Sequence, residues 1–102
     1  MNRRRDELSI PWSVNGLAAV TAARGDLDRA AVLVGFAEAG IERAGGEWPP
    51  DERRQYEGTL ETLRAGLASD ALDRARATGA AMSTAEGLDY ALSAPAPAAP
   101  AG

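Results

Sequence analysis

The sequence predicts an all-α fold of four to five short antiparallel helices, and three observations support this prediction. Apolar residues recur at spacings of three and four in every periodic segment, which is the period of an α-helix. No segment shows the alternation rich in β-branched residues that is typical of a strand. Helix-breaking residues punctuate the chain at intervals that suit short helices: Gly25, Gly45–Gly46, Pro49–Pro50 and Gly79.

The length of 102 residues suits one small domain, with polar or proline-rich segments at both ends. Residues 1–7 are polar, and we expect them to be disordered. Residues 8–92 carry the helical periodicity and form the expected domain. Residues 93–102 are rich in proline and alanine, and we expect a disordered tail because its three prolines prevent a helix.

The first helix is expected over residues 11–24, since proline suits the first turn, where its missing N–H is not needed. Gly25 is placed to end this helix in the left-handed conformation, and Asp26 can cap the next one. Its expected buried stripe consists of Ile10, Val14, Leu17 and Thr21.

The second helix is expected over residues 27–44. Residues 30–37 carry no charge on any face, so we expect this helix to lie between its neighbours rather than at the edge of the domain. Its stripe consists of Leu27, Ala30, Val34, Ala37 and Ile41.

Three shorter signals predict the remaining helices. The third helix begins at Pro49–Pro50 followed by two acids, with Trp48 expected to pack over its start. The fourth is expected over residues 70–78, capped by Ser69. The fifth is expected over residues 84–92, where Ser83 and Glu86 have the spacing of a capping box. The expected buried residues are Tyr56, Leu60, Leu63, Leu67, Leu72, Ala75, Leu88 and Leu92.

The composition excludes several kinds of chemistry. The chain has no lysine, histidine or cysteine, and all 11 of its basic residues are arginine. It therefore lacks the residues for Ser-His-Asp or Cys-His catalysis, for a usual zinc site, for a phosphate-loop lysine and for disulfides. We interpret the recurring carboxylate pairs, such as Glu38 and Glu42, as solvated faces. We expect no enzyme activity, no cofactor and no metal, and the sequence identifies no small-molecule substrate.

Charge and hydropathy bear on partners and location. The net charge of −4 argues against direct nucleic-acid binding, which usually needs a basic face. The longest uncharged stretch in the domain, residues 8–23, is too short to span a bilayer. Residues 3–5 are basic, but two acids follow at once instead of the apolar run of a secretory signal. We expect a cytoplasmic protein without a membrane partner.

Residues 14–37 have the spacing of a tetratricopeptide repeat. Leu17–Ala18 match its large-small pair and Gly25 matches its turn glycine. Val14 and Thr21 depart from it, because aromatic residues are common at both positions. The small-large-small stripe of its second helix is matched by Ala30, Val34 and Ala37.

A longer resemblance covers about residues 8–92 and depends on six motifs. They are Gly-Leu-Ala-Ala-Val at 16–20, Ala-Ala-Arg-Gly-Asp at 22–26, Arg-Ala-Ala-Val-Leu-Val-Gly at 29–35, Gly-Gly-Glu-Trp-Pro-Pro at 45–50, Glu-Arg-Arg-Gln-Tyr-Glu at 52–57 and Ala-Glu-Gly-Leu-Asp-Tyr-Ala-Leu at 85–92. With them the chain resembles the C-terminal tetratricopeptide-like helical region of bacterial LuxR-type transcriptional regulators and related signalling ATPases. The nucleotide-binding and helix-turn-helix domains of such proteins have no counterpart in these motifs.

The resemblance implies a helical-repeat fragment that acts as a non-catalytic protein-interaction module of a signalling or transcription-regulating protein. Its partner would be another protein, its parent domains or a second copy of itself. The alternative is a small stand-alone regulator linked to DNA. On the repeat alignment, Trp12 and Asn15 fall where such repeats line a binding groove. Alternatively, Trp12 packs on the second helix and Asn15 is simply exposed.

Overall fold

The computed structural model describes residues 3–93, with side chains described from residue 10 onward. This part of the chain contains five helices and no strand, which confirms the all-α prediction. The expected disordered tail lies outside the described residues except for Ser93, as do residues 1 and 2. The helices are α1 (Arg3–Ala23), α2 (Leu27–Arg43), α3 (Pro50–Gly66), α4 (Ser69–Ala80) and α5 (Thr84–Leu92).

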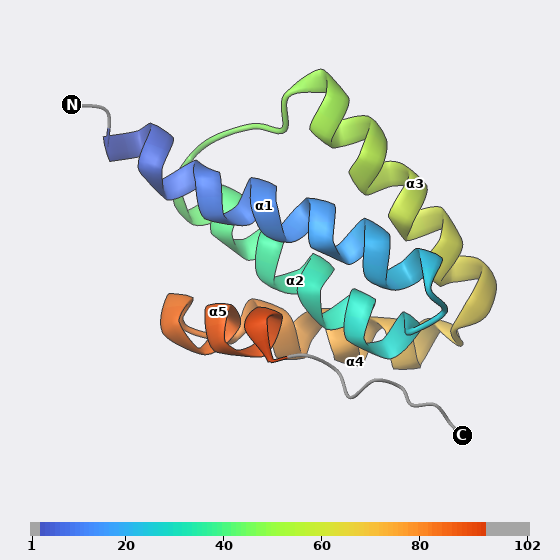
Figure 1. The fold of residues 1–102 in the computed structure, drawn as a ribbon. Helices are drawn as coiled ribbons and strands as arrows, with labels where there is room; N and C mark the ends of the chain where they lie inside the picture. Colours follow the sequence, from blue (N-terminus) through green and yellow to red (C-terminus); the bar gives the residue numbers. More distant parts are fainter. Residues whose placement is uncertain (1–2, 94–102) are drawn as a thin grey trace.

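The second helix, α2, is the centre of the molecule. It contacts all four other helices, and its closest packing is against α1 and α4 (Figure 1). Helix α3 lies mainly against α1, and α5 lies against α2. The uncharged stretch of α2 is buried as expected, because neighbours cover it on several sides.

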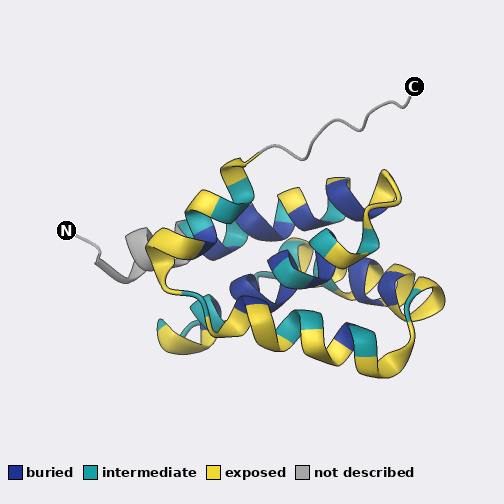
Figure 2. Cartoon of the chain, turned by 90° about the horizontal axis from the view of Figure 1, so that it is seen from below, coloured by how far each residue is buried: buried dark blue, intermediate teal, exposed yellow. Residues whose placement is uncertain are grey.

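The core lies along the faces where the helices meet, with exposed residues on their outer faces (Figure 2). The expected stripe of α2 is confirmed, with Leu27 partly buried at its start. Leu60 and Leu63 of α3 and Leu72 of α4 are buried as expected. The whole buried cluster consists of Val14, Ala18, Ala22, Ala30, Ala31, Leu33, Val34, Phe36, Ala37, Leu60, Leu63 and Leu72.

Helix α1 differs from the expectation in two ways. It begins at Arg3, so the predicted start at Pro11 is wrong; Pro11 lies inside the helix. Its buried face also includes Ala18 and Ala22, while Leu17 is 37% exposed. Small alanines let the α1 and α2 backbones approach closely, which leaves the larger leucine turned outward.

Helices α2 and α4 cross at two glycines. A Cβ atom added to Gly35 would lie 2.0 Å from the Arg76 carbonyl oxygen, and one added to Gly79 would lie 1.9 Å from the Val32 carbonyl oxygen. The two backbones are therefore in direct contact. The sequence prediction treated Gly79 as a helix breaker; it lies inside α4 instead, at the closest approach of the two helices.

The helix termini confirm some predictions and correct others. Gly25 adopts φ of 90°, in the left-handed region, and ends α1 as expected. Asp26 is the N-cap residue of α2, but its side chain makes no capping bond. Ser69 lies inside α4, whose N-cap is Ala68, so the predicted serine cap is wrong. The capping box of α5 is confirmed, with Ser83 Oγ accepting from the Glu86 N–H at 3.1 Å.

Candidate interaction surface

The first predicted site residue, Asn15, is buried between α1 and α3. It is 0% exposed, and its Nδ2 donates to the Glu52 carbonyl oxygen at 3.1 Å and to Glu52 Oε1 at 3.0 Å. Both interpretations of the sequence placed Asn15 at the surface, and both are wrong on this point. The first turn of α3 packs onto α1 and supplies two acceptors that match the amide donors.

The second predicted site residue, Trp12, lies one helical turn before Asn15 and is partly buried. Its indole Nε1 and the Oδ1 of Asn15 are buried atoms with no hydrogen-bond partner among the described residues. The structure therefore places both residues on one side of α1, but the Trp12 Nε1 and Asn15 Oδ1 atoms are buried. Neither residue presents a polar group on an exposed groove.

A polar cluster absent from the sequence prediction ties three helices together. Glu38 of α2 accepts a hydrogen bond from the Tyr56 hydroxyl of α3 at 2.5 Å. It also forms an ion pair with Arg76 of α4, whose Nη2 and Nε lie 2.5 and 3.2 Å from the carboxylate oxygens. Glu38 is therefore a partly buried link between helices, and its interpretation as part of a solvated face is wrong.

Trp48 adds an aromatic face to this cluster. Its ring stacks on that of Tyr56, with centroids 4.4 Å apart and planes 14° from parallel. Trp48 therefore packs on α3 through Tyr56, which lies in the second turn of that helix. Burial of Tyr56, together with the Glu38 carboxylate, raises the pKa of its phenol to about 12. The hydroxyl therefore stays protonated at neutral pH and acts as a hydrogen-bond donor to Glu38.

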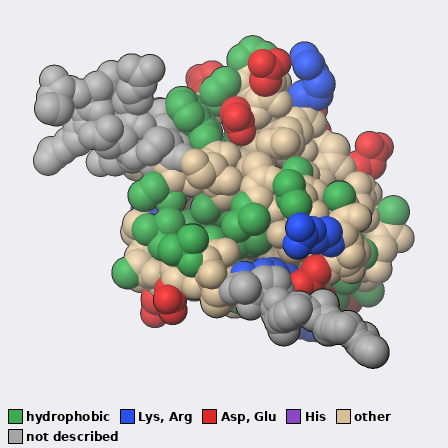
Figure 3. All heavy atoms as spheres, in the orientation of Figure 1, with side chains coloured by type: hydrophobic (Ala, Val, Ile, Leu, Met, Phe, Trp, Pro, Cys, Tyr) green, Lys and Arg blue, Asp and Glu red, His purple; other side chains and the backbone are tan. Residues whose placement is uncertain are grey.

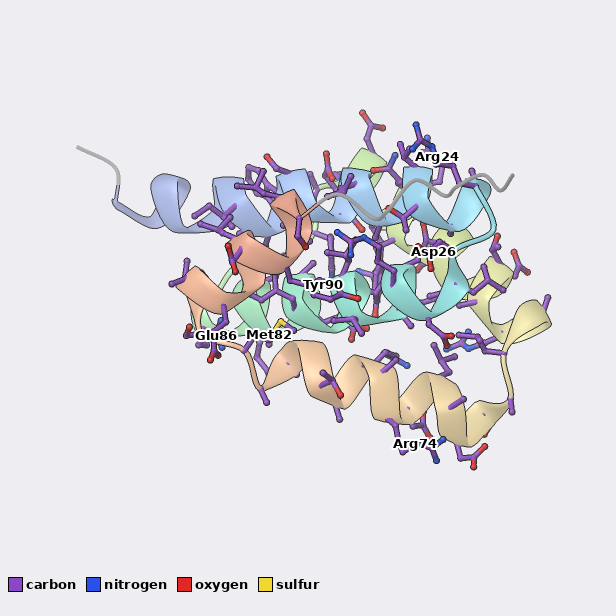
Figure 4. All side chains as sticks on the ribbon, turned by 60° about the horizontal axis from the view of Figure 1, so that its bottom comes forward. Arg24, Asp26, Arg74, Met82, Glu86 and Tyr90 are labelled. Atoms are coloured by element: carbon purple, nitrogen blue, oxygen red, sulfur yellow. The ribbon has the colours of Figure 1, made fainter. Side chains whose placement is uncertain are left out.

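A second link fastens α5 to α2. The Arg29 guanidinium lies 4.6 Å from the centroid of the Tyr90 ring, and its Nη2 donates to the Tyr90 carbonyl oxygen at 2.6 Å and to the carbonyl oxygen of Ser93. Figure 4 shows Tyr90 between α5 and α2. This pair fixes the C-terminal end of α5, whose N-terminal end is held by its capping box.

The outward face of α1 carries apolar side chains that no described element covers. Val20 is 51% exposed and Leu17 is 37% exposed, and their spacing of three residues places them side by side on the helix. Leu92, at the end of α5, is 80% exposed, so its prediction as a buried residue is wrong. Figure 3 shows further apolar side chains gathered over α5 and the neighbouring ends of α1 and α2.

The chain matches no family model, no curated protein and no solved structure in comparisons with known proteins. The resemblance to LuxR-type regulators and the repeat alignment therefore stay predictions. Among the described residues, no group of three or more acidic, histidine or cysteine side chains could hold a metal ion. None of the described helices combines the length and the apolar character needed to cross a bilayer.

Proposed function

We propose that this chain is a non-catalytic protein-interaction module, a helical piece of a signalling or transcription-regulating protein. It binds a protein partner through helix–helix contacts made by the outward face of α1. The observation that carries this proposal is the adjacent, exposed pair Leu17 and Val20. Two neighbouring apolar side chains on a helix form part of a ridge against which a partner helix can pack.

The architecture supports the proposal in a second way. The side chains of Glu38 and Arg29 form hydrogen bonds between helices, so they are engaged within the fold. The face of α1 around Val20 carries no such internal contact and is available to a partner. The resemblance to the helical region of LuxR-type regulators favours a partner within a signalling assembly, or a second copy of the chain.

A photocrosslinking experiment tests this proposal directly. A benzoylphenylalanine is placed at Val20, and a matched control is placed at Ala77, an exposed alanine on α4. We expect one adduct of defined mass from position 20 in the cells that produce the protein, and none from position 77. A second copy as partner would give a homodimer adduct with the purified chain alone.

A second variant tests whether the crosslink depends on the outward face of α1. Leu17→Arg adds a charge beside the crosslinker, and we expect it to abolish the adduct while the helical circular dichroism stays unchanged. If both positions give the same adducts, or if neither gives any, then the outward face of α1 is not an interaction surface and the proposal fails.

A further inference from the structure

A cavity of about 330 Å³ lies at one end of the helix bundle, where α1, α2 and α5 meet. Its volume falls within the range of small-molecule sites, roughly 300–1,000 Å³. None of the described contacts that support the proposed function involves this cavity. It is lined by Ile10, Pro11, Phe36, Gly40, Arg43, Ala44 and Thr84.

The apolar wall of the cavity is held in place by close packing. Phe36 is a core residue, and a Cβ atom added to Gly87 of α5 would lie 2.1 Å from its ring. Pro11 of α1 packs on Gly40 of α2, where an added Cβ atom would lie 2.9 Å from the proline Cγ. These close contacts join the three helices that form the cavity, α1, α2 and α5.

Among the lining residues whose side chains the structure describes, one carries a formal charge, and that charge is positive. Arg43 is exposed in the last turn of α2 and forms no ion pair with any carboxylate among the described side chains. Thr84 adds a hydroxyl on the opposite element, at the start of α5. An apolar wall beside a guanidinium that pairs with no described carboxylate complements a molecule with an apolar body and one anionic end.

We propose that this cavity binds a small amphipathic carboxylate, a medium-chain acyl or arylalkyl acid. The apolar body lies against Ile10, Pro11 and Phe36, and the carboxylate pairs with Arg43. Guanidinium and carboxylate match in geometry because two parallel N–H groups can donate to the two oxygens. Thr84 supplies a further hydroxyl donor at the same edge.

Octanoate and octanol provide a matched pair of probes, because they differ mainly in the charged end. We expect octanoate to bind the protein about tenfold more tightly than octanol, as measured by titration calorimetry. Arg43→Gln keeps a polar side chain at the surface, and we expect it to remove this difference while leaving octanol binding unchanged. Equal binding of the two probes, or an unchanged preference in the Arg43→Gln variant, would overturn the proposal.

A second pair of variants tests the location. Ala44→Leu fills the cavity, and we expect it to abolish binding of both probes. Ala77→Leu adds the same side chain on the exposed face of α4 and should have no effect. Octanoate should shift the amide resonances of Gly40 and Thr84. Shifts confined to the outward face of α1, or no binding of either probe, would show that the cavity is not a carboxylate site.

Discussion

Tyr56 shows how one side chain can serve two kinds of contact at once. Its ring stacks on Trp48 in the connection before α3, and its hydroxyl donates to Glu38 on α2. The periodicity of α3 predicted an apolar contact at this position, and the hydroxyl adds a polar one. A phenol suits this place because it combines a large apolar ring with a single polar atom at its tip.

The raised pKa of Tyr56 makes stability depend on pH in the alkaline range. The phenol has an ordinary pKa of 10.0 and a folded-state pKa of about 12, so the folded state holds its proton more tightly. Tyr56 therefore contributes stability that is present below pH 10 and is lost as the pH rises through about 12. Urea unfolding at about pH 9 and about pH 11 should show this loss.

The matched control for this prediction is Tyr56→Phe, which keeps the ring but has no proton to lose. It should lose less stability than the wild type between the two pH values. The other tyrosine, Tyr90, also has a raised pKa because of its burial. Its contribution to the loss of stability at alkaline pH is the same in the wild type and in the Tyr56→Phe variant. Parallel losses in wild type and variant would contradict the assignment to Tyr56.

Single residues were the hardest features to predict from the sequence. Asn15 and Glu38 both follow buried positions of their helices, yet their partners lie 37 and 18 or more residues away in the chain. Helical periodicity identifies a face but not the neighbour that meets it. One signal in the sequence indicated that Glu38 is partly buried. It lies between the predicted buried positions Ala37 and Ile41, on the helix that was expected to be covered on several sides.

At the scale of elements, the α2–α4 crossing is the tightest contact described above. Two glycines face the opposing backbone there, so the helices approach without intervening side chains. Such an approach brings many backbone and side-chain atoms into van der Waals contact. The entropy that glycine loses within a helix is the cost of this arrangement.

Replacing one of these glycines should destabilise the protein strongly. Gly79→Ala places a methyl group against the Val32 carbonyl oxygen, and we expect a loss of more than about 2 kcal/mol in the free energy of unfolding. Gly58→Ala is the matched control, since nothing lies within 4 Å of its added Cβ atom in α3. That variant should gain about 0.5–1 kcal/mol, because alanine favours a helix interior.

Denaturant unfolding of the two alanine variants would compare them directly. Effects of the same sign and size would show that α2 and α4 are not in backbone contact.

The number and order of the helices were predictable because each has its own periodicity and a local end signal, such as Gly25 or the Ser83 capping box. The start of α1 was not predictable, because proline is favoured in the first turn of a helix and Pro11 therefore indicated a start at the wrong residue. Its place inside α1 removes one backbone donor, and local sequence does not reveal whether the helix continues before it.

The whole molecule is organised around α2, and stability should be distributed accordingly. Helix α2 contacts every other helix, whereas α5 is short and packs chiefly on α2. The only buried residue of α5 is Gly87. Elements with few buried contacts open locally at a lower free energy than the global unfolding of the domain.

Native-state hydrogen exchange should reveal this hierarchy. Amides in the middle of α2 should exchange only through global unfolding, and amides of α5 should exchange through a local opening of lower free energy. Arg29→Ala removes the contact with Tyr90 and should speed exchange in α5 alone, while Arg74→Ala, at an exposed position of α4, should not. Equal protection of α2 and α5 would contradict this distribution.

The central position of α2 also sets the order in which the fold can be assembled during synthesis. Helices α1 and α2 are joined by residues 24–26 alone, so they can form a hairpin as soon as both have left the ribosome. The partner on the other side, α4, follows only after the whole of α3. Until residues 69–80 emerge, the nascent hairpin leaves one apolar side of α2 in water, and that interval is when a chaperone or another nascent chain can bind it.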